Sequence, residues 1–142
     1  MVKESGQEAM TPKKCSSVRY LDDGPYPAHI GILLSEGAYA RACRNLDTDL
    51  GLPDWPGPCS AFTLCLESDE SCLIWLAFNM EGVNRHSPDT GFQSIVVHEV
   101  SHAWTYINKA MNVAEEDNAE YRAYFLQWLY RSCIDAIREG WR

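Results

Sequence analysis

The sequence predicts an α+β fold of one domain, in which a small sheet that contains antiparallel strands packs against two long helices near the C-terminus. Two strand-like runs, 60–68 and 72–79, are joined by a short acidic turn, which predicts a hairpin. Apolar residues then recur at helical spacing over 90–111 and again over 121–137. A length of 142 residues suits one domain better than two.

The N-terminal part predicts one strand and one helix. Residues 1–17 are polar and are expected to form a mobile tail, so the folded domain is expected to span 18–142. The short apolar run 28–34 predicts a strand or an extended entry segment. Ser35 is a suitable N-cap for a helix that runs to about Leu46.

A loop and the hairpin come next. Residues 47–58 carry three prolines and two glycines, which predicts an irregular loop. Apolar and other residues alternate in the first strand, 60–68, and the turn is expected at 69–71. The second strand, 72–79, is apolar on both faces, which indicates that helices cover one side of it.

The composition disfavours two classes of partner. The formal net charge is −8 and no basic run exceeds Lys13 and Lys14, whereas phosphate binding requires clustered lysine and arginine, so no nucleic-acid partner is expected. No stretch approaches the ~18 uninterrupted apolar residues of a membrane span, so no membrane partner is expected either. The polar start lacks the apolar core of a secretory signal, and we expect a cytoplasmic protein.

The cysteines are expected to be free thiols. The chain has six of them and contains no CxxC pair, and without a secretory signal an even number does not by itself indicate disulfides. Cys59, Cys65 and Cys72 are spaced too irregularly for a zinc knuckle. A structural site of cysteines and zinc is therefore not expected.

One largely apolar run contains two histidines and a glutamate. In "QSIVVHEVSHAWTYI", residues 93–107, His98 and His102 are four positions apart and share one face of a helix. Two imidazole nitrogens at about 2.0–2.1 Å are typical zinc ligands, and Glu99 beside them can accept a proton from water on the metal. A chance HExxH is expected in roughly one chain in a few hundred of this length, so the motif favours a zinc site.

A catalytic zinc site usually has a third protein ligand and an open position for water. The metzincin pattern would need a histidine at position 108, which is Asn108 here. The remaining choice is a carboxylate in the next helix, where the candidates are Glu115, Glu116, Asp117 and Glu120. The first three fall where the start of a helix favours acidic residues, and Glu120 lies one turn further in. We expect Glu120 to be the third ligand, with Glu116 as the next alternative.

Other polar side chains could support this site. Ligating imidazoles usually donate their second nitrogen to a carboxylate, carbonyl or water, for which the candidates are Tyr106, Asp117, Asn118 and Gln127. Tyr106 and Tyr124 could also donate to an oxyanion, although packing between two helices explains either tyrosine more simply. His29 and His86 are not expected to bind metal, because the histidine pair already explains it.

The segments "HEVSHAW" and "NAEYRAYFLQWL" together resemble the zincin superfamily, and within it the gluzincins, whose third ligand is a glutamate. The resemblance is closest to small metallopeptidases of tailed bacteriophages and prophages, and covers about residues 28–135. It implies that His98, His102 and Glu120 bind Zn²⁺ while Glu99 is the general base. It also implies that strand 72–79 lies along the cleft and pairs with extended substrate.

These residues favour a zinc-dependent hydrolase, most directly a metallopeptidase that acts on a protein or peptide through metal-activated water. Hydrolysis of another amide, such as a cell-wall link, fits the same motif. The alternative is a metal-stabilised phage protein that binds a host protein without catalysis. An open coordination position would favour the hydrolase, and closure by four protein ligands would favour the binding protein.

Overall fold

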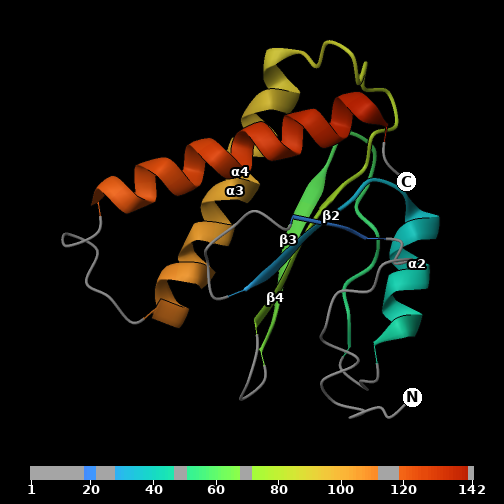
Figure 1. Ribbon diagram of the computed structural model, residues 1–142. Coiled ribbons are helices and arrows are strands. Elements are labelled where there is room, and N and C mark those ends of the chain that lie inside the picture. The colour runs from blue at the N-terminus through green and yellow to red at the C-terminus, as the bar shows by residue number, and fades with distance from the viewer. Residues whose placement is uncertain (1–17, 22–27, 47–50, 68–71, 112–118, 141–142) are drawn as a thin grey trace.

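The computed structural model describes residues 18–21, 28–46, 51–67, 72–111 and 119–140 (Figure 1). Along the chain the elements are β1 (Arg19–Tyr20), β2 (His29–Leu33), α2 (Glu36–Asn45), β3 (Ala61–Glu67), β4 (Cys72–Phe78), α3 (Thr90–Met111) and α4 (Ala119–Glu139). The α+β class is confirmed. The hairpin strands and the first two helices lie within about a residue of their predicted bounds. The predicted tail, 1–17, and the predicted turn, 69–71, lie outside the described residues.

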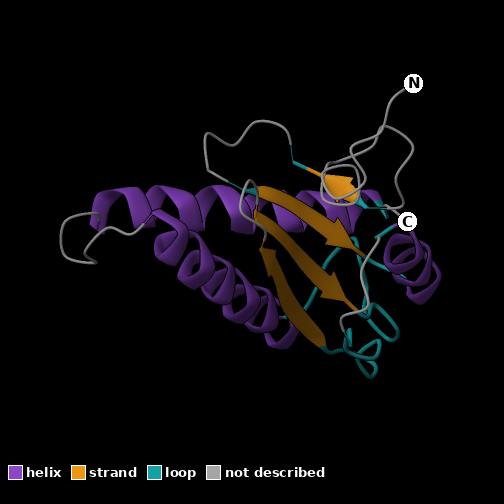
Figure 2. Ribbon diagram, turned by 90° about the horizontal axis from the view of Figure 1, so that it is seen from below, coloured by secondary structure: helices purple, strands orange, loops and turns teal. Residues whose placement is uncertain are grey.

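The four strands form one mixed sheet in the order β1-β2-β4-β3 (Figure 2). β3 and β4 pair antiparallel as the predicted hairpin, and β1 pairs antiparallel with β2. β2 and β4 are parallel, because the chain passes through α2 and β3 between them. The sheet therefore contains antiparallel pairs without being purely antiparallel, and β3 is one of its two edges.

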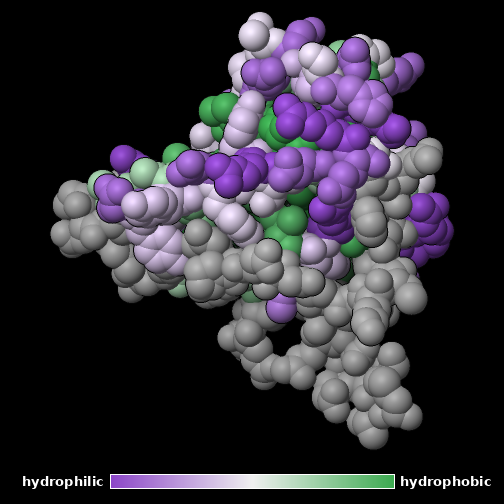
Figure 3. Space-filling view, turned by 45° about the horizontal axis from the view of Figure 1, so that its top comes forward, coloured by the Kyte–Doolittle hydropathy of each residue, from purple (hydrophilic) through white to green (hydrophobic). Residues whose placement is uncertain are grey.

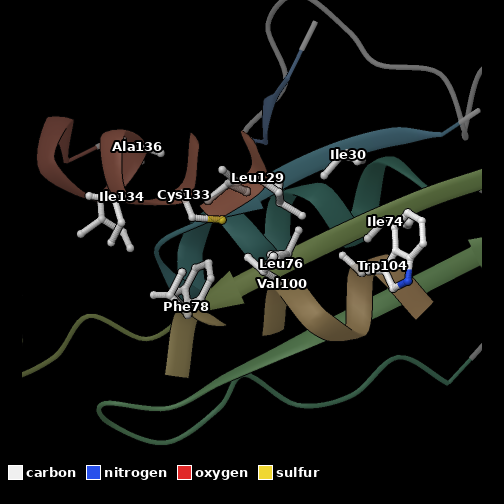
Figure 4. Packing of buried hydrophobic residues seen from close by; sticks show 14 of the residues in the cluster. Ile30, Ile74, Leu76, Phe78, Val100, Trp104, Leu129, Cys133, Ile134 and Ala136 are labelled. Atoms are coloured by element: carbon white, nitrogen blue, oxygen red, sulfur yellow. The ribbon is translucent and has the colours of Figure 1, made fainter. Parts of the chain in front are cut away.

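Helices cover both faces of the sheet. All seven residues of β4 are buried, and alternate ones enter two different clusters. Leu76 and Phe78 point toward α3 and α4 (Figure 4). Leu73 and Trp75 pack on the opposite side with Tyr39 of α2. The prediction that helices cover one side of this strand was thus too narrow, because a strand that is apolar on both faces is buried on both.

Side-chain caps fix where two helices begin. The Ser35 hydroxyl accepts the backbone N–H of Ala38 at 3.1 Å, as predicted for the start of α2. At the start of α3, a carboxylate oxygen of Asp89 accepts the N–H of Phe92 at 2.9 Å. Because the start of α3 is fixed in this way, the register of the motif that follows on the helix is fixed as well.

The outward face of α4 is largely hydrophilic (Figure 3), with exposed Gln127, Arg131 and Asp135. Near the end of α4, Glu139 forms an ion pair with Arg19 of β1. In the described part of the chain, none of the helices has both the length and the apolar character that crossing a bilayer requires.

Gly31 of β2 lies where a side chain does not fit. A Cβ there would be 2.2 Å from Cγ1 of Val18 and 3.0 Å from a ring carbon of Tyr20. We expect Gly31→Ala to lower the free energy of unfolding by about 1–3 kcal/mol, measured by urea denaturation, because Val18 would have to move. The matched control is Gly37→Ala at an exposed position of α2, where the atom nearest to the added Cβ would lie at 3.4 Å. It should raise stability by about 0.5–1 kcal/mol, and equal effects of the two substitutions would contradict the packing over Gly31.

Candidate metal centre

His98 and His102 lie one turn apart on α3, and both are exposed. Their Nε2 atoms are 3.1 Å apart and their ring centroids 4.7 Å apart. Two nitrogens at this separation, each about 2.0–2.1 Å from one zinc ion, would subtend roughly 100° at the metal, close to the tetrahedral angle. The rings therefore converge on one point in a geometry that suits two ligands of a zinc ion.

The opposite face of α3 is buried, so the helix holds the pair on a rigid base. Val96, Ala103 and Ile107 are wholly buried in the cluster between the sheet, α3 and α4. The helix face that carries the histidines also carries Gly91 and Ile95, at spacings of about one turn. Burial of one face therefore leaves the other, with both imidazoles, open to solvent.

Glu99 is buried, with 6% of its surface exposed. The hydroxyl of Thr63 in β3 lies 2.6 Å from its Oε1 and 3.1 Å from its backbone oxygen. Thr63 therefore ties the predicted general base to the edge strand of the sheet. Glu99 follows His98 in the chain, about 100° around the helix, and its carboxylate lies on the side of α3 that faces β3.

The strand beside the candidate site is β3 and not β4. The resemblance had implied that 72–79 lies along a cleft and pairs with substrate, but β4 is paired on one side with β2 and on the other with β3. Its backbone hydrogen-bonding groups are therefore engaged along its length. The edge strand next to Glu99 is β3, which has only β4 as a partner among the described strands.

The structure does not bring Glu120 to the histidine pair. Glu120 lies exposed in the first turn of α4, where the helix dipole alone favours a carboxylate. α4 packs on α3 through Trp104, whose ring lies 5.4 Å from that of Phe125. Trp104 follows His102 by two positions, which is roughly 200° around the helix. α4 thus contacts the flank of α3 that faces away from the imidazoles.

No third ligand atom lies close to both imidazoles among the described residues. There, no further histidine, cysteine or carboxylate places a ligand atom within 4.8 Å of both imidazoles. The alternative candidates Glu115, Glu116 and Asp117, with Asn118, lie outside the described residues. The third ligand therefore stays a prediction.

The other predicted site residues are placed as follows. Tyr106 is half-buried against the cluster beneath α3, whereas Tyr124 is 62% exposed and Gln127 is also exposed on α4. His29 begins β2, and His86 is exposed in the turns before α3. No hydrogen bond or ring contact joins any of these five described side chains to the histidine pair.

A pocket of about 420 Å³ lies beside the first two turns of α3. Ile95 and Gly91 line it from the helix, and Cys59 lines it from the segment just before β3. Ile95 precedes His98 by three positions, so the pocket opens on the helix face that carries the imidazoles. Its volume falls in the range of a site for a small molecule or a large side chain.

A second cluster of potential ligands was missed from the sequence. The ligand atoms of Cys65, Glu67 and Cys72 lie within 4.8 Å of one another near the turn end of the β3–β4 hairpin. The spacing of these three residues along the chain does not predict the cluster. It forms because strand pairing places Cys72 directly opposite Glu67. The cluster could have been predicted from the register of the hairpin together with the alternation of side chains along β3, which puts Cys65 and Glu67 on one face.

Comparison of the chain with models of protein families, with curated proteins and with solved structures gives no match. The relation to the zincin superfamily therefore stays a prediction from the HExxH motif and the order of the elements around it. The side chains that indicate a function form two pairs, His98 with His102 and Glu99 with Thr63.

Proposed function

We propose that the protein is a zinc-dependent hydrolase of the zincin type, in which His98 and His102 hold the metal and Glu99 is the general base. The observation that carries the proposal is the 3.1 Å separation of the Nε2 atoms of His98 and His102 on the exposed face of α3, a helix whose other face is buried. Glu99 follows His98 directly, which is the position that the HExxH mechanism assigns to the base.

Bound zinc would polarise a carbonyl and lower the pKa of a bound water molecule to about 7. The chain supplies the groups that handle the proton. Thr63 donates to Oε1 of Glu99, and among the described residues the second oxygen of this carboxylate has no hydrogen-bond partner. That oxygen is the one that would take the proton from water and pass it to the leaving amine.

We propose a protein or peptide as the substrate. An extended peptide could add to the edge of β3 that no described strand covers, next to Thr63, which contacts the base. A substrate side chain could then enter the pocket lined by Cys59 and Ile95. Both features lie beside α3, so they would align a peptide bond with the histidine pair.

The second candidate is a metal-stabilised protein that binds a partner without catalysis. The burial of Glu99 and its hydrogen bond to Thr63 favour it, since the same contact serves as a link between α3 and the edge strand. In this case Glu99 is structural and the metal only stabilises the fold.

The proposal extends to the origin and compartment of the protein. The similarity of the HExxH helix and the following helix to small phage metallopeptidases favours a bacteriophage or prophage protein that works in the bacterial cytoplasm. The described cysteines, Cys43, Cys59, Cys65, Cys72 and Cys133, are free thiols, which suits a reducing compartment.

The first test is the metal content of purified variants. His98→Ala and His102→Ala should each lose one zinc ion per chain relative to wild type, because a single imidazole does not retain the ion. His86→Ala removes an exposed histidine elsewhere and should bind as much zinc as wild type. Unchanged zinc in both motif variants would contradict the proposal.

Glu120→Ala in the same series tests the third ligand. Loss of the ion would assign the carboxylate of Glu120 to the metal. Retention would leave the remaining coordination positions to water or to a group in the segment 112–118.

A further inference from the structure

Three potential metal ligands gather at the end of the sheet toward the hairpin turn. The sulfur atoms of Cys65 and Cys72 are 3.6 Å apart, and a carboxylate oxygen of Glu67 completes a group within 4.8 Å. Cys72 is buried, Cys65 is half-buried and Glu67 is exposed. The group is therefore anchored in the core and open to solvent on one side.

The register of the hairpin disfavours a disulfide between the two thiols. Cys72 lies directly opposite Glu67, and Cys65 lies opposite Ile74, so the cysteines are diagonal neighbours across the strands. Diagonal neighbours in an antiparallel pair are about 7–8 Å apart, beyond the Cα separation of about 4.4–6.8 Å that a disulfide requires. Closing the S–S bond would thus require movement of the backbone.

The same geometry suits a metal ion between the sulfurs. With Zn–S bonds of about 2.3 Å, two sulfurs 3.6 Å apart subtend roughly 100° at the ion. Carboxylate and thiolate are both zinc ligands, and Glu67 stands on the same strand face as Cys65. No rearrangement of the strands is needed to bring the three ligand atoms to one ion.

The local charges match a divalent cation. Two thiolates and a carboxylate carry about three negative charges, which a divalent ion and one ammonium group would neutralise. Lys109 of α3 acts electrostatically on Cys65 and supplies such a positive charge.

We propose that Cys65, Glu67 and Cys72 form a second metal site, separate from the histidine pair, which binds Zn²⁺ through two thiolates and a carboxylate. An ion there would join β3 to β4 at the turn end of the hairpin. It would thereby hold the edge strand that carries Thr63 against α3.

Titration of the reduced full-length protein with Co²⁺, a spectroscopic substitute for zinc, tests the site. Thiolate ligands give a sulfur-to-cobalt charge-transfer absorption in the near ultraviolet, which a site of imidazoles and carboxylates does not give. We expect this absorption in wild type and its loss in Cys65→Ser and Cys72→Ser. Cys59→Ser, which removes an exposed thiol elsewhere, should keep it.

Two further variants distinguish a failure of this proposal from a failure of the proposed function and from misfolding. The double variant His98→Ala, His102→Ala should keep the thiolate absorption, so the two metal sites can fail independently. Glu67→Gln changes an exposed side chain and should lower the affinity for Co²⁺ at least about tenfold. Glu81→Gln, also exposed, should leave the affinity unchanged.

Three results would overturn the proposal. They are the lack of thiolate absorption in reduced wild type, its persistence in both cysteine variants, and equal Co²⁺ affinity of wild type and Glu67→Gln.

Discussion

Glu99→Gln is expected to lower the rate of hydrolysis by about 10²–10⁴-fold while the zinc content stays at the wild-type level. The amide that replaces the carboxylate still accepts the hydrogen bond from Thr63, so the link between α3 and β3 is kept. It no longer accepts the proton of a metal-bound water molecule. The measurement is cleavage of a bacterial peptide library by the zinc-loaded protein, followed by mass spectrometry of the new termini, together with metal analysis.

Thr63→Val is the matched variant for this prediction. It removes the hydroxyl that lies 2.6 Å from Oε1 and keeps a side chain of similar shape. We expect a smaller loss of rate than for Glu99→Gln, because the base remains and only its position is less well fixed. If Glu99→Gln cleaves peptides at the wild-type rate, Glu99 is not the general base. The binding-protein candidate is favoured instead if the zinc-loaded wild type cleaves no peptide.

Local patterns predicted most of the fold. Helix α3 was predicted at its observed bounds from its long apolar periodicity. The cap at Asp89, which closes its first turn with a side-chain hydrogen bond, was not predicted. Ser35 correctly predicted the start of α2, because its hydroxyl accepts a backbone N–H in the first turn of the helix. Strand β4 was predicted from an unbroken apolar run, which fits a strand with neighbours on both sides and helices on both faces.

The order and direction of the strands could not be predicted from local sequence patterns. The order β1-β2-β4-β3 and the parallel pairing of β2 with β4 depend on contacts between distant segments. β1 has only two residues, Arg19 and Tyr20, which is too short for a recognisable alternation. Its position over Gly31 follows from packing that a single sequence does not reveal.

The candidate sites also differ in whether local sequence spacing or non-local contacts determine them. His98 and His102 converge because of a spacing within one helix, which sequence alone specifies. The choice of Glu120 depended on how α4 turns against α3, and its side chain lies in the exposed first turn of α4 instead of among inward-facing residues. The Cys65 and Cys72 thiols meet through strand register, and a spacing rule for zinc knuckles cannot detect that.

Phe125→Ala is expected to lower the free energy of unfolding by about 3–5 kcal/mol, a large share of the ~5–15 kcal/mol typical of a domain. Phe125 has no exposed surface, and its ring lies 5.4 Å from that of Trp104 and 6.0 Å from that of Trp128. Removing it leaves a cavity between α4 and α3 that the neighbouring rings fill only in part. Urea denaturation followed by circular dichroism measures the change.

Tyr124→Ala is the control, because the neighbouring side chain is also aromatic but 62% exposed. It should change stability by no more than about 0.5 kcal/mol. Since α4 packs on the flank of α3 opposite the imidazoles, neither substitution should lower zinc binding at the histidine pair under conditions where the variant is folded. A loss of that zinc in Tyr124→Ala would mean that α4 contributes to the metal site, as the prediction of Glu120 as the third ligand requires. A small effect of Phe125→Ala on stability would instead contradict the packing of α4 on Trp104.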